Sequence, residues 1–238
     1  MSGWDIEETR KHILHLYGRS QLDLVRPSLR SVVDRKGYAR LHYLDARDTL
    51  DSFVQVKLQK TSLLEVFLAD DDETQTEFQI FILKIGAYVT ACIQSLHAVA
   101  DILGHAIYYG LAMDRSSKPL LNRNISAGTV LRKLQDDPGL ARLYVLYDRL
   151  CNGGSFSHLT PLANHSKHRS VVLPSLNEDQ TGQKPGRHML RLAAFEYEGE
   201  NYPEVSIKDF LAAEYDRCSV LVIEIGNELN AVLRARIA

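Results

Sequence analysis

The sequence predicts a mainly α-helical bundle with a small antiparallel β-hairpin inserted before the last long helix. Long segments place apolar residues at alternating steps of three and four, which is the spacing of one helical face. The 238 residues are 45% hydrophobic and 24% charged, an ordinary composition for a globular chain that can bury a sizeable core. Short strand-like segments fall between residues 170 and 205. We therefore expect a single helical domain over 1–238, with its β insertion at about 169–205.

Apolar periodicity defines most of the expected helices. Residues 20–44 have no clear pattern, and the strongest signal lies in 74–111. The last helix has a good start signal, because Ser206 is a favourable N-cap and Asp209 follows at the third helical position. The residues of the 74–111 stripe are Phe78, Phe81, Ile85, Val89, Cys92, Leu96, Val99, Leu103 and Ile107. The expected helices are 4–17, 46–69, 74–111, 127–135, 138–151 and 206–235.

Strand signals are few. We expect strands over 170–174 and 189–197, and 202–205 is expected to pair back across a Gly-Glu-Asn turn. Two segments rich in Gly, Pro and polar residues, 114–126 and 175–188, are expected to be loops.

Charge and cysteine content exclude several classes of protein. The formal net charge is −2, so no overall basic field attracts nucleic acid, and a polyanion site would have to be local. Three cysteines, widely spaced and without a C-x-x-C pair, argue against a disulfide scaffold and a structural zinc site. The first residues lack the apolar core of a secretory signal, and no run of about 18 apolar residues predicts a membrane span. We expect a cytoplasmic protein that does not enter a membrane.

A row of polar residues lies opposite the apolar stripe of 74–111. His97, Asp101 and His105 are each four residues apart and share one helix edge, with Gln94 and Tyr108 nearby. Three interpretations are open: a solvent-exposed face, a polar site in which Asp101 orients a histidine, or a metal site. One ion cannot join His97 to His105, because residues eight apart are separated by about 12 Å along a helix.

A dense cluster of basic and polar side chains lies in ANHSKHR, residues 163–169. We expect ANHSKH to end a helix that begins near Ser157 or Thr160, and cations at a helix C-terminus are favoured by the macrodipole. This electrostatic preference explains the presence of Lys167 and Arg169 without assigning a function to them. It does not explain Asn164 together with His165 and His168, since a histidine beside a cation and an amide can bind a phosphate or assist attack on one.

This cluster resembles the motif of the HEPN superfamily, in which arginine is followed by Asn, His or Asp, three further residues and histidine. Asn164 and His168 take the second and last positions. The pattern N-x-x-K-H-R, which leads into an expected strand, is also similar to the variant motif of bacterial HEPN-like proteins of unknown function. Ala163 stands where the family has arginine, so Lys167 or Arg169 would have to supply the cation, and lysine lacks the planar fork of arginine.

The resemblance implies a metal-independent endoribonuclease of a toxin or defence system, active as a homodimer and needing no cofactor or metal. An alternative is a non-catalytic HEPN-like module that binds RNA, a nucleotide or a partner protein, which Ala163 favours. A third hypothesis is a metal-dependent helical-bundle enzyme centred on His97, Asp101 and His105. By the resemblance, the catalytic residues are Asn164 and His168, the phosphate-binding residues are Lys167 and Arg169, and the supporting residues are His165, His97, Asp101 and His105.

Overall fold

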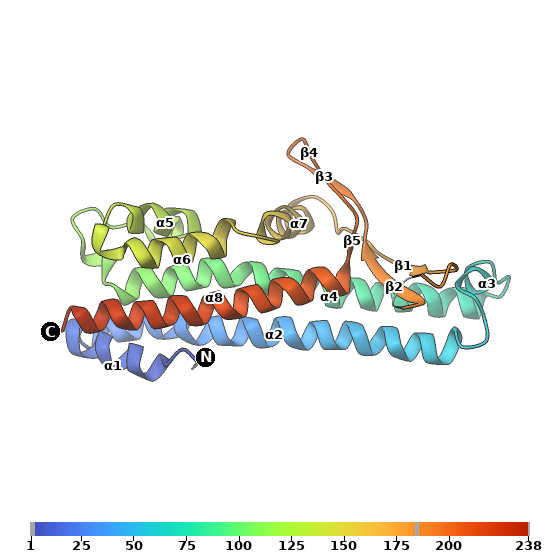
Figure 1. Cartoon of the computed structure of the whole chain (residues 1–238), viewed down its shortest axis with the longest axis horizontal. Coiled ribbons are helices and arrows are strands. Elements are labelled where there is room, and N and C mark those ends of the chain that lie inside the picture. The colour runs from blue at the N-terminus through green and yellow to red at the C-terminus, as the bar shows by residue number, and fades with distance from the viewer. Residues whose placement is uncertain (1–2, 184–185, 238) are drawn as a thin grey trace. The chain divides into compact units, whose positions relative to one another are not determined.

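The computed structural model describes residues 3–183 and 186–237, and it confirms the expected fold class (Figure 1). Long helices dominate, and a small group of antiparallel strands precedes the last of them. The helices are α1 (Ile6–Tyr17), α2 (Arg19–Lys57), α3 (Leu63–Phe67), α4 (Asp72–Gly110), α5 (Ala127–Gln135), α6 (Ala141–Asn152), α7 (Phe156–His168) and α8 (Ile207–Ala235). The strands are β1 (Pro174–Glu178), β2 (His188–Leu192), β3 (Phe195–Tyr197), β4 (Glu200–Tyr202) and β5 (Val205–Ser206).

The helices with strong apolar stripes lie where the sequence predicts them. The helix expected over 74–111 is α4, and the one expected over 206–235 is α8, with the Asp209 amide donating to the Ser206 hydroxyl at 3.3 Å. The expected helix at 46–69 is wrong in its boundaries. α2 already begins at Arg19 and ends at Lys57, and Ser62 then starts the short α3 through a capping box with Glu65.

The expected strand boundaries are wrong in four places. The segment expected as a strand over 202–205 contains only the last residue of β4 and the first residue of β5, which belong to different sheets. Residues 170–173 are not a strand, and 175–188, expected to be a loop, contains most of β1. The segment expected as one strand over 189–197 is two strands in different sheets, because β2 pairs with β1 and β5, whereas β3 pairs with β4. The break lies at residues 193 and 194, between β2 and β3. The turn that joins β3 to β4 is tight, because Glu198 and Gly199 both have positive φ, at 54° and 84°.

The chain divides into two compact units, which are described separately. Unit 1 comprises Met1–Gly37, Ser95–Ser157 and Glu214–Ala238, and unit 2 comprises Tyr38–Gln94 and His158–Ala213. The expectation of a single domain over 1–238 stays a prediction.

The core of unit 1 is apolar and includes two polar networks that tie its helices together. Tyr147 is fully buried and donates its hydroxyl to the Ala100 carbonyl at 2.9 Å. Glu214, 1% exposed, is held by the Arg217 guanidinium at 2.7 and 2.8 Å. The same guanidinium donates to the carbonyls of Arg149 and Leu150 at the end of α6. Buried ionic groups of this kind are stable only while every partner is present.

The core of unit 2 joins a helix pair to the small sheet. Phe53 of α2 stacks on Phe81 of α4, with ring centroids 4.0 Å apart. β1 lies against α4 at Gly86, where the ring of Pro174 comes within 3.6 Å of the position that a β-carbon would occupy. This is an ordinary van der Waals distance, so β1 packs directly against α4 at this point. Leu176, Leu190 and Leu192 of the sheet are buried.

The three cysteines bear on the expectation that the chain is not a disulfide scaffold. Cys92, Cys151 and Cys218 are free and buried, and burial raises the pKa of each thiol to about 12. These thiols are therefore protonated and poorly reactive at neutral pH.

Among the described helices, α4 has the length and composition of a membrane-spanning helix, with a mean hydropathy of 1.4 over 18 residues. The expected cytoplasmic location without membrane contact stays a prediction.

Candidate functional site: the end of α7 and the β3–β4 hairpin

The ANHSKHR cluster lies in unit 2, at the C-terminal end of α7 and just beyond it. The helix ends tightly, because the amides of Arg169 and Ser170 both donate to the His165 carbonyl, at 2.9 and 3.1 Å. The His165 ring reaches the Ser170 carbonyl through Nδ1, at 2.7 Å. Since a carbonyl only accepts, Nδ1 must carry the proton in this contact. His165 thus closes the helix end, a role that the sequence did not indicate.

The remaining residues of the cluster divide into a buried and an exposed set. Ala163 is fully buried, and its carbonyl accepts a hydrogen bond from Gln94 at 2.9 Å. An arginine at this position would have to displace neighbouring core atoms. Asn164 is half-buried, whereas Lys167, His168 and Arg169 are exposed. The cations Lys167 and Arg169 therefore lie on the surface. The position at which the HEPN motif has arginine is occupied by a buried alanine that belongs to the core.

An aromatic hairpin lies against this helix end. The Arg169 guanidinium lies over the Tyr197 ring of β3, 4.8 Å from its centroid, which is a cation–π contact. The His165 ring meets Phe195 and Tyr197 at centroid distances of 5.5 and 6.3 Å. Phe195 in turn stacks on Tyr202 of β4 at 4.9 Å, so the hairpin is an aromatic support for the end of α7.

Tyr197, Phe195 and His158 are the residues of this site that sequence reasoning missed. Phe195 and Tyr197 are two residues apart in a strand, so they share one face of the hairpin, and this F-x-Y alternation was the available signal. His158 of α7 packs on Phe195 and Tyr202, and burial lowers the pKa of its imidazole. The neutral form of His158 is therefore favoured, as suits a ring packed among aromatic side chains.

We call Asn164, Lys167, His168, Arg169 and Tyr197 the α7–hairpin surface. Its exposed groups are two cations and an imidazole, and the Tyr197 ring beside them is half-buried. Carboxylates also lie on the hairpin, and Glu198 lies beside the Tyr197 hydroxyl, where burial first and then this carboxylate raise the pKa of the phenol. The positive charge of the surface therefore lies on the α7 side and not at the hairpin turn.

The polar row on α4 contributes to packing, and the solvent-exposed interpretation of this row is wrong. Tyr108 is fully buried, and Gln94, His97, Asp101 and His105 are all at least partly buried. In unit 1, Asp101 accepts the Ala127 amide at 2.8 Å and so caps the first turn of α5, while the His97 ring stacks on Phe156 at 5.7 Å. The role of His97, Asp101 and His105 as support for the residues of α7 stays a prediction.

The metal interpretation has no geometric support in the described parts of the chain. Across residues 3–183 and 186–237, no group of three or more His, Cys, Asp or Glu side chains is placed to hold one metal ion.

The fold and the surface together define a mainly α-helical bundle protein in which a late helix ends in a basic and aromatic surface. No family model, no curated protein and no solved structure matches the chain. The relation to the HEPN superfamily consequently rests on the resemblance of residues 163–169 and enters below as part of a proposal.

Proposed function

We propose that the chain binds single-stranded RNA through the α7–hairpin surface. The observation that supports this most is the Arg169 guanidinium over the Tyr197 ring at 4.8 Å, beside the exposed Lys167 and His168. Proteins bind single strands by combining cations that follow the phosphates with aromatic faces on which bases stack. The resemblance to HEPN proteins supports RNA as the nucleic acid.

The geometry favours binding over cleavage. A general acid or base must be held within reach of the proton that it transfers, usually by a partner that orients its ring. His165 uses Nδ1 to close the helix end, and His168 is an exposed ring on the last turn of α7. The arginine that the family uses to hold phosphate is replaced by a buried alanine, so Lys167 and Arg169 are left to contact the backbone of the strand.

The affinity should depend on salt and on Tyr197. With two or three phosphate contacts, the logarithm of the binding constant should fall with the logarithm of salt at a slope of about −1.4 to −2.1, from about −0.7 for each contact to a single strand. Tyr197→Ala should weaken binding by about 1–3 kcal/mol, the usual cost of losing one base–aromatic stack. Arg169→Ala should weaken binding and flatten the salt slope by about 0.7. Fluorescence anisotropy of a labelled 12-nucleotide RNA measures both quantities.

Matched variants show whether RNA binds at the α7–hairpin surface or whether its affinity depends only on the overall charge of the protein. Tyr38→Ala and Lys84→Ala remove an exposed aromatic ring and an exposed cation elsewhere in unit 2, and both should leave the affinity unchanged. Glu198→Gln removes a carboxylate next to Tyr197 and should tighten binding. Equal losses from Tyr38→Ala and Tyr197→Ala would show that the RNA is held at some other place.

A metal-independent ribonuclease is a second candidate. The observation that favours it is the placement of Asn164 and His168 one helical turn apart, so that an amide and an imidazole share one edge of α7. In this reaction the 2′-hydroxyl attacks the adjacent phosphate, giving a 2′,3′-cyclic phosphate and a 5′-hydroxyl end. His168 would take the 2′ proton, and the leaving 5′ oxygen would gain one from water or a second His168 in a homodimer, as the resemblance implies.

Cleavage in the presence of EDTA tests this candidate. If the chain is a nuclease, the wild-type protein should release products with cyclic phosphate ends, and His168→Ala should slow cleavage about 10²–10⁴-fold while binding persists. RNA that stays intact while it is bound by the wild-type protein would exclude cleavage and leave the binding function in place.

A further inference from the structure

β1 lies at an open edge of the small sheet in unit 2. The sheet has the strand order β1-β2-β5, so among the described strands β1 has a neighbour on one side only. Its register with β2 is fixed at both ends, where the Asp179 amide donates to the Arg187 carbonyl at 2.7 Å and the Ala193 amide donates to the Leu173 carbonyl at 3.3 Å. Successive residues of a strand direct their main-chain groups to opposite sides. The odd-numbered residues of 173–179 therefore face β2, and the even-numbered residues face the open edge.

The open edge presents unpaired main-chain groups. Leu176 and Glu178 direct both N–H and C=O outward, and within residues 3–183 and 186–237 these groups have no hydrogen-bond partner. Pro174 directs only its carbonyl outward, because proline has no N–H. The Glu178 side chain is 5% exposed although the residue as a whole is half-buried, so its main chain is exposed. An extended chain is the partner that matches such groups, because its own N–H and C=O groups face one side at every second residue.

A pocket of about 480 Å³ runs along the same edge. All five residues of β1 line it, and no described residue of β2 does, so the pocket lies on the side of β1 away from β2. Its opposite wall is mostly apolar and includes Leu64 and Phe67 of α3 and Phe78 and Ile82 of α4. Leu64 and Phe67 are 55% and 59% exposed. The edge of β1 thus lies beside an apolar pocket that can receive the side chains of an added strand.

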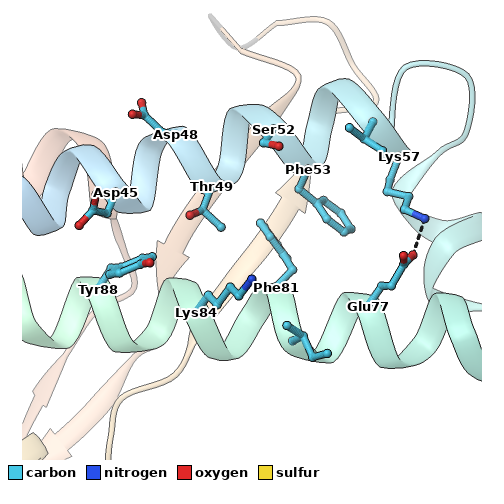
Figure 2. Close-up of a pocket in the computed structure, with 12 residues that line it drawn as sticks. Asp45, Asp48, Thr49, Ser52, Phe53, Lys57, Glu77, Phe81, Lys84 and Tyr88 are labelled. Carbon is cyan, nitrogen blue, oxygen red and sulfur yellow. Dashed lines mark ion pairs between the residues drawn. The ribbon is translucent and has the colours of Figure 1, made fainter.

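This pocket is distinct from the groove between α2 and α4 that Figure 2 shows. That groove lies on another face of α4, and the stacked rings of Phe53 and Phe81 line it. The residues that line the groove belong to two helices, whose main-chain groups are bonded within each helix. Only the pocket beside β1 has main-chain groups that specify the conformation of what binds there.

The pocket is already formed in the chain alone. The Glu178 carboxylate accepts the Leu63 amide at 3.0 Å and so joins β1 to the start of α3. The same carboxylate accepts Nε of Arg187 at 2.8 Å. At the other end of β1, the ring of Pro174 packs on α4 at Gly86. Preformed sites bind more tightly because less order has to be gained on binding.

A strand of another protein fits this edge better than β1 of a second copy. Each copy would bring its own Pro174, so a self-paired edge lacks a hydrogen bond that a proline-free strand makes. β1 has five residues and is therefore about 17 Å long. Contact along so short a strand buries far less than the roughly 800 Å² that each partner of a stable dimer buries.

We propose that the edge of β1 binds an extended segment of a partner protein, which adds to the sheet antiparallel to β1 and places apolar side chains in the pocket. In an antiparallel pair, residues that exchange both hydrogen bonds lie opposite each other with their side chains on one face. The residues of the segment that bond to Leu176 and Glu178 are therefore those whose side chains face α3 and α4. This site is separate from the α7–hairpin surface, and its test uses no RNA.

A synthetic peptide of eight residues, with alternating valine and threonine between terminal lysines, provides the probe. Valine is the residue expected in the apolar pocket, so the N–H groups of the valines should bond to β1. N-methylation of the valines removes these donors and should weaken binding at least about tenfold, as measured by fluorescence anisotropy. N-methylation of the threonines removes donors on the far edge of the peptide and should change the affinity by less than about twofold.

Matched variants of the protein locate the peptide. Leu64→Asp places a carboxylate in the pocket wall and should weaken binding about tenfold or more, while an acidic residue in the first turn of α3 is compatible with the helix. Leu83→Asp changes an aliphatic residue of α4 that is 73% exposed and does not line the pocket, so it should have little effect. Circular dichroism should show unchanged helix content in both variants.

Four results would overturn the proposal. They are absence of binding of the unmethylated peptide up to about 1 mM, binding that tolerates N-methylation of the valines, equal losses from methylated valines and methylated threonines, and equal losses from Leu64→Asp and Leu83→Asp. Light scattering that shows a dimer lost in Leu64→Asp would assign the edge to a second copy and overturn it as well.

Discussion

Replacing Arg217 with alanine is expected to lower the free energy of unfolding by about 3–5 kcal/mol, the cost of removing one partner from a buried ion pair. Arg217 donates to both carboxylate oxygens of Glu214 at 2.7 and 2.8 Å, and Glu214 is 1% exposed. Alanine would leave that carboxylate buried without its cation. It would also release the carbonyls of Arg149 and Leu150, which end α6. Chemical denaturation followed by circular dichroism measures the loss.

Two further variants show whether the buried charge is the cause. Arg217→Lys keeps the charge but not the planar fork that reaches four acceptors, so it should be destabilised by less than the alanine variant. Adding Glu214→Gln to Arg217→Ala removes the unpaired charge and should restore part of the loss. A loss below about 1 kcal/mol for Arg217→Ala would mean that this pair behaves as an exposed one.

Gly104→Ala is expected to destabilise the chain by about 1–3 kcal/mol, although alanine is the better helix former by about 1 kcal/mol. The new β-carbon would collide with the Tyr147 hydroxyl, which is fully buried and donates to the Ala100 carbonyl. Because Tyr147 is fully buried, we expect α4 and α6 to shift or the hydroxyl to lose its acceptor. Thermal and urea unfolding test this result.

A second change at Tyr147 isolates the collision. In the Gly104→Ala background, Tyr147→Phe removes the oxygen, and the nearest ring carbon, Cζ, then lies 3.5 Å from the new β-carbon. The double variant should therefore be more stable than Gly104→Ala alone, which is a favourable coupling in a double-mutant cycle. Gly37→Ala is the control, because Gly37 is an exposed residue of α2 with nothing within 4 Å of its β-position, and it should stabilise by about 0.5–1 kcal/mol. A neutral Gly104→Ala would contradict the packing described here.

Apolar periodicity predicted the helices that bury a continuous face, and it failed where pairing decides the structure. α4 and α8 follow directly from their stripes, and Ser206 marks the start of α8 correctly. The β-strands are short, and their register depends on contacts between distant segments, such as Leu176 opposite Leu190. Alternation within one segment does not contain that information.

In the candidate site too, features of a single segment could be predicted from the sequence, whereas contacts between distant segments could not. Exposure of Lys167, His168 and Arg169 could be expected from a basic helix end, and the structure has them exposed. Tyr197 could not be joined to Arg169 from the sequence, because their contact depends on how the hairpin folds back on α7. Asp101 likewise had an unforeseen partner, the first amide of α5.

The most direct test of the RNA-binding proposal is photo-crosslinking of a 4-thiouridine RNA to the wild-type chain, followed by trypsin digestion and mass spectrometry. RNA on the α7–hairpin surface should crosslink to the peptide 192–208, which contains Tyr197, and the crosslink should be lost in Tyr197→Ala and retained in Tyr38→Ala. Crosslinks that map only to peptides of α2 or α4, with none in 192–208, would contradict the proposal.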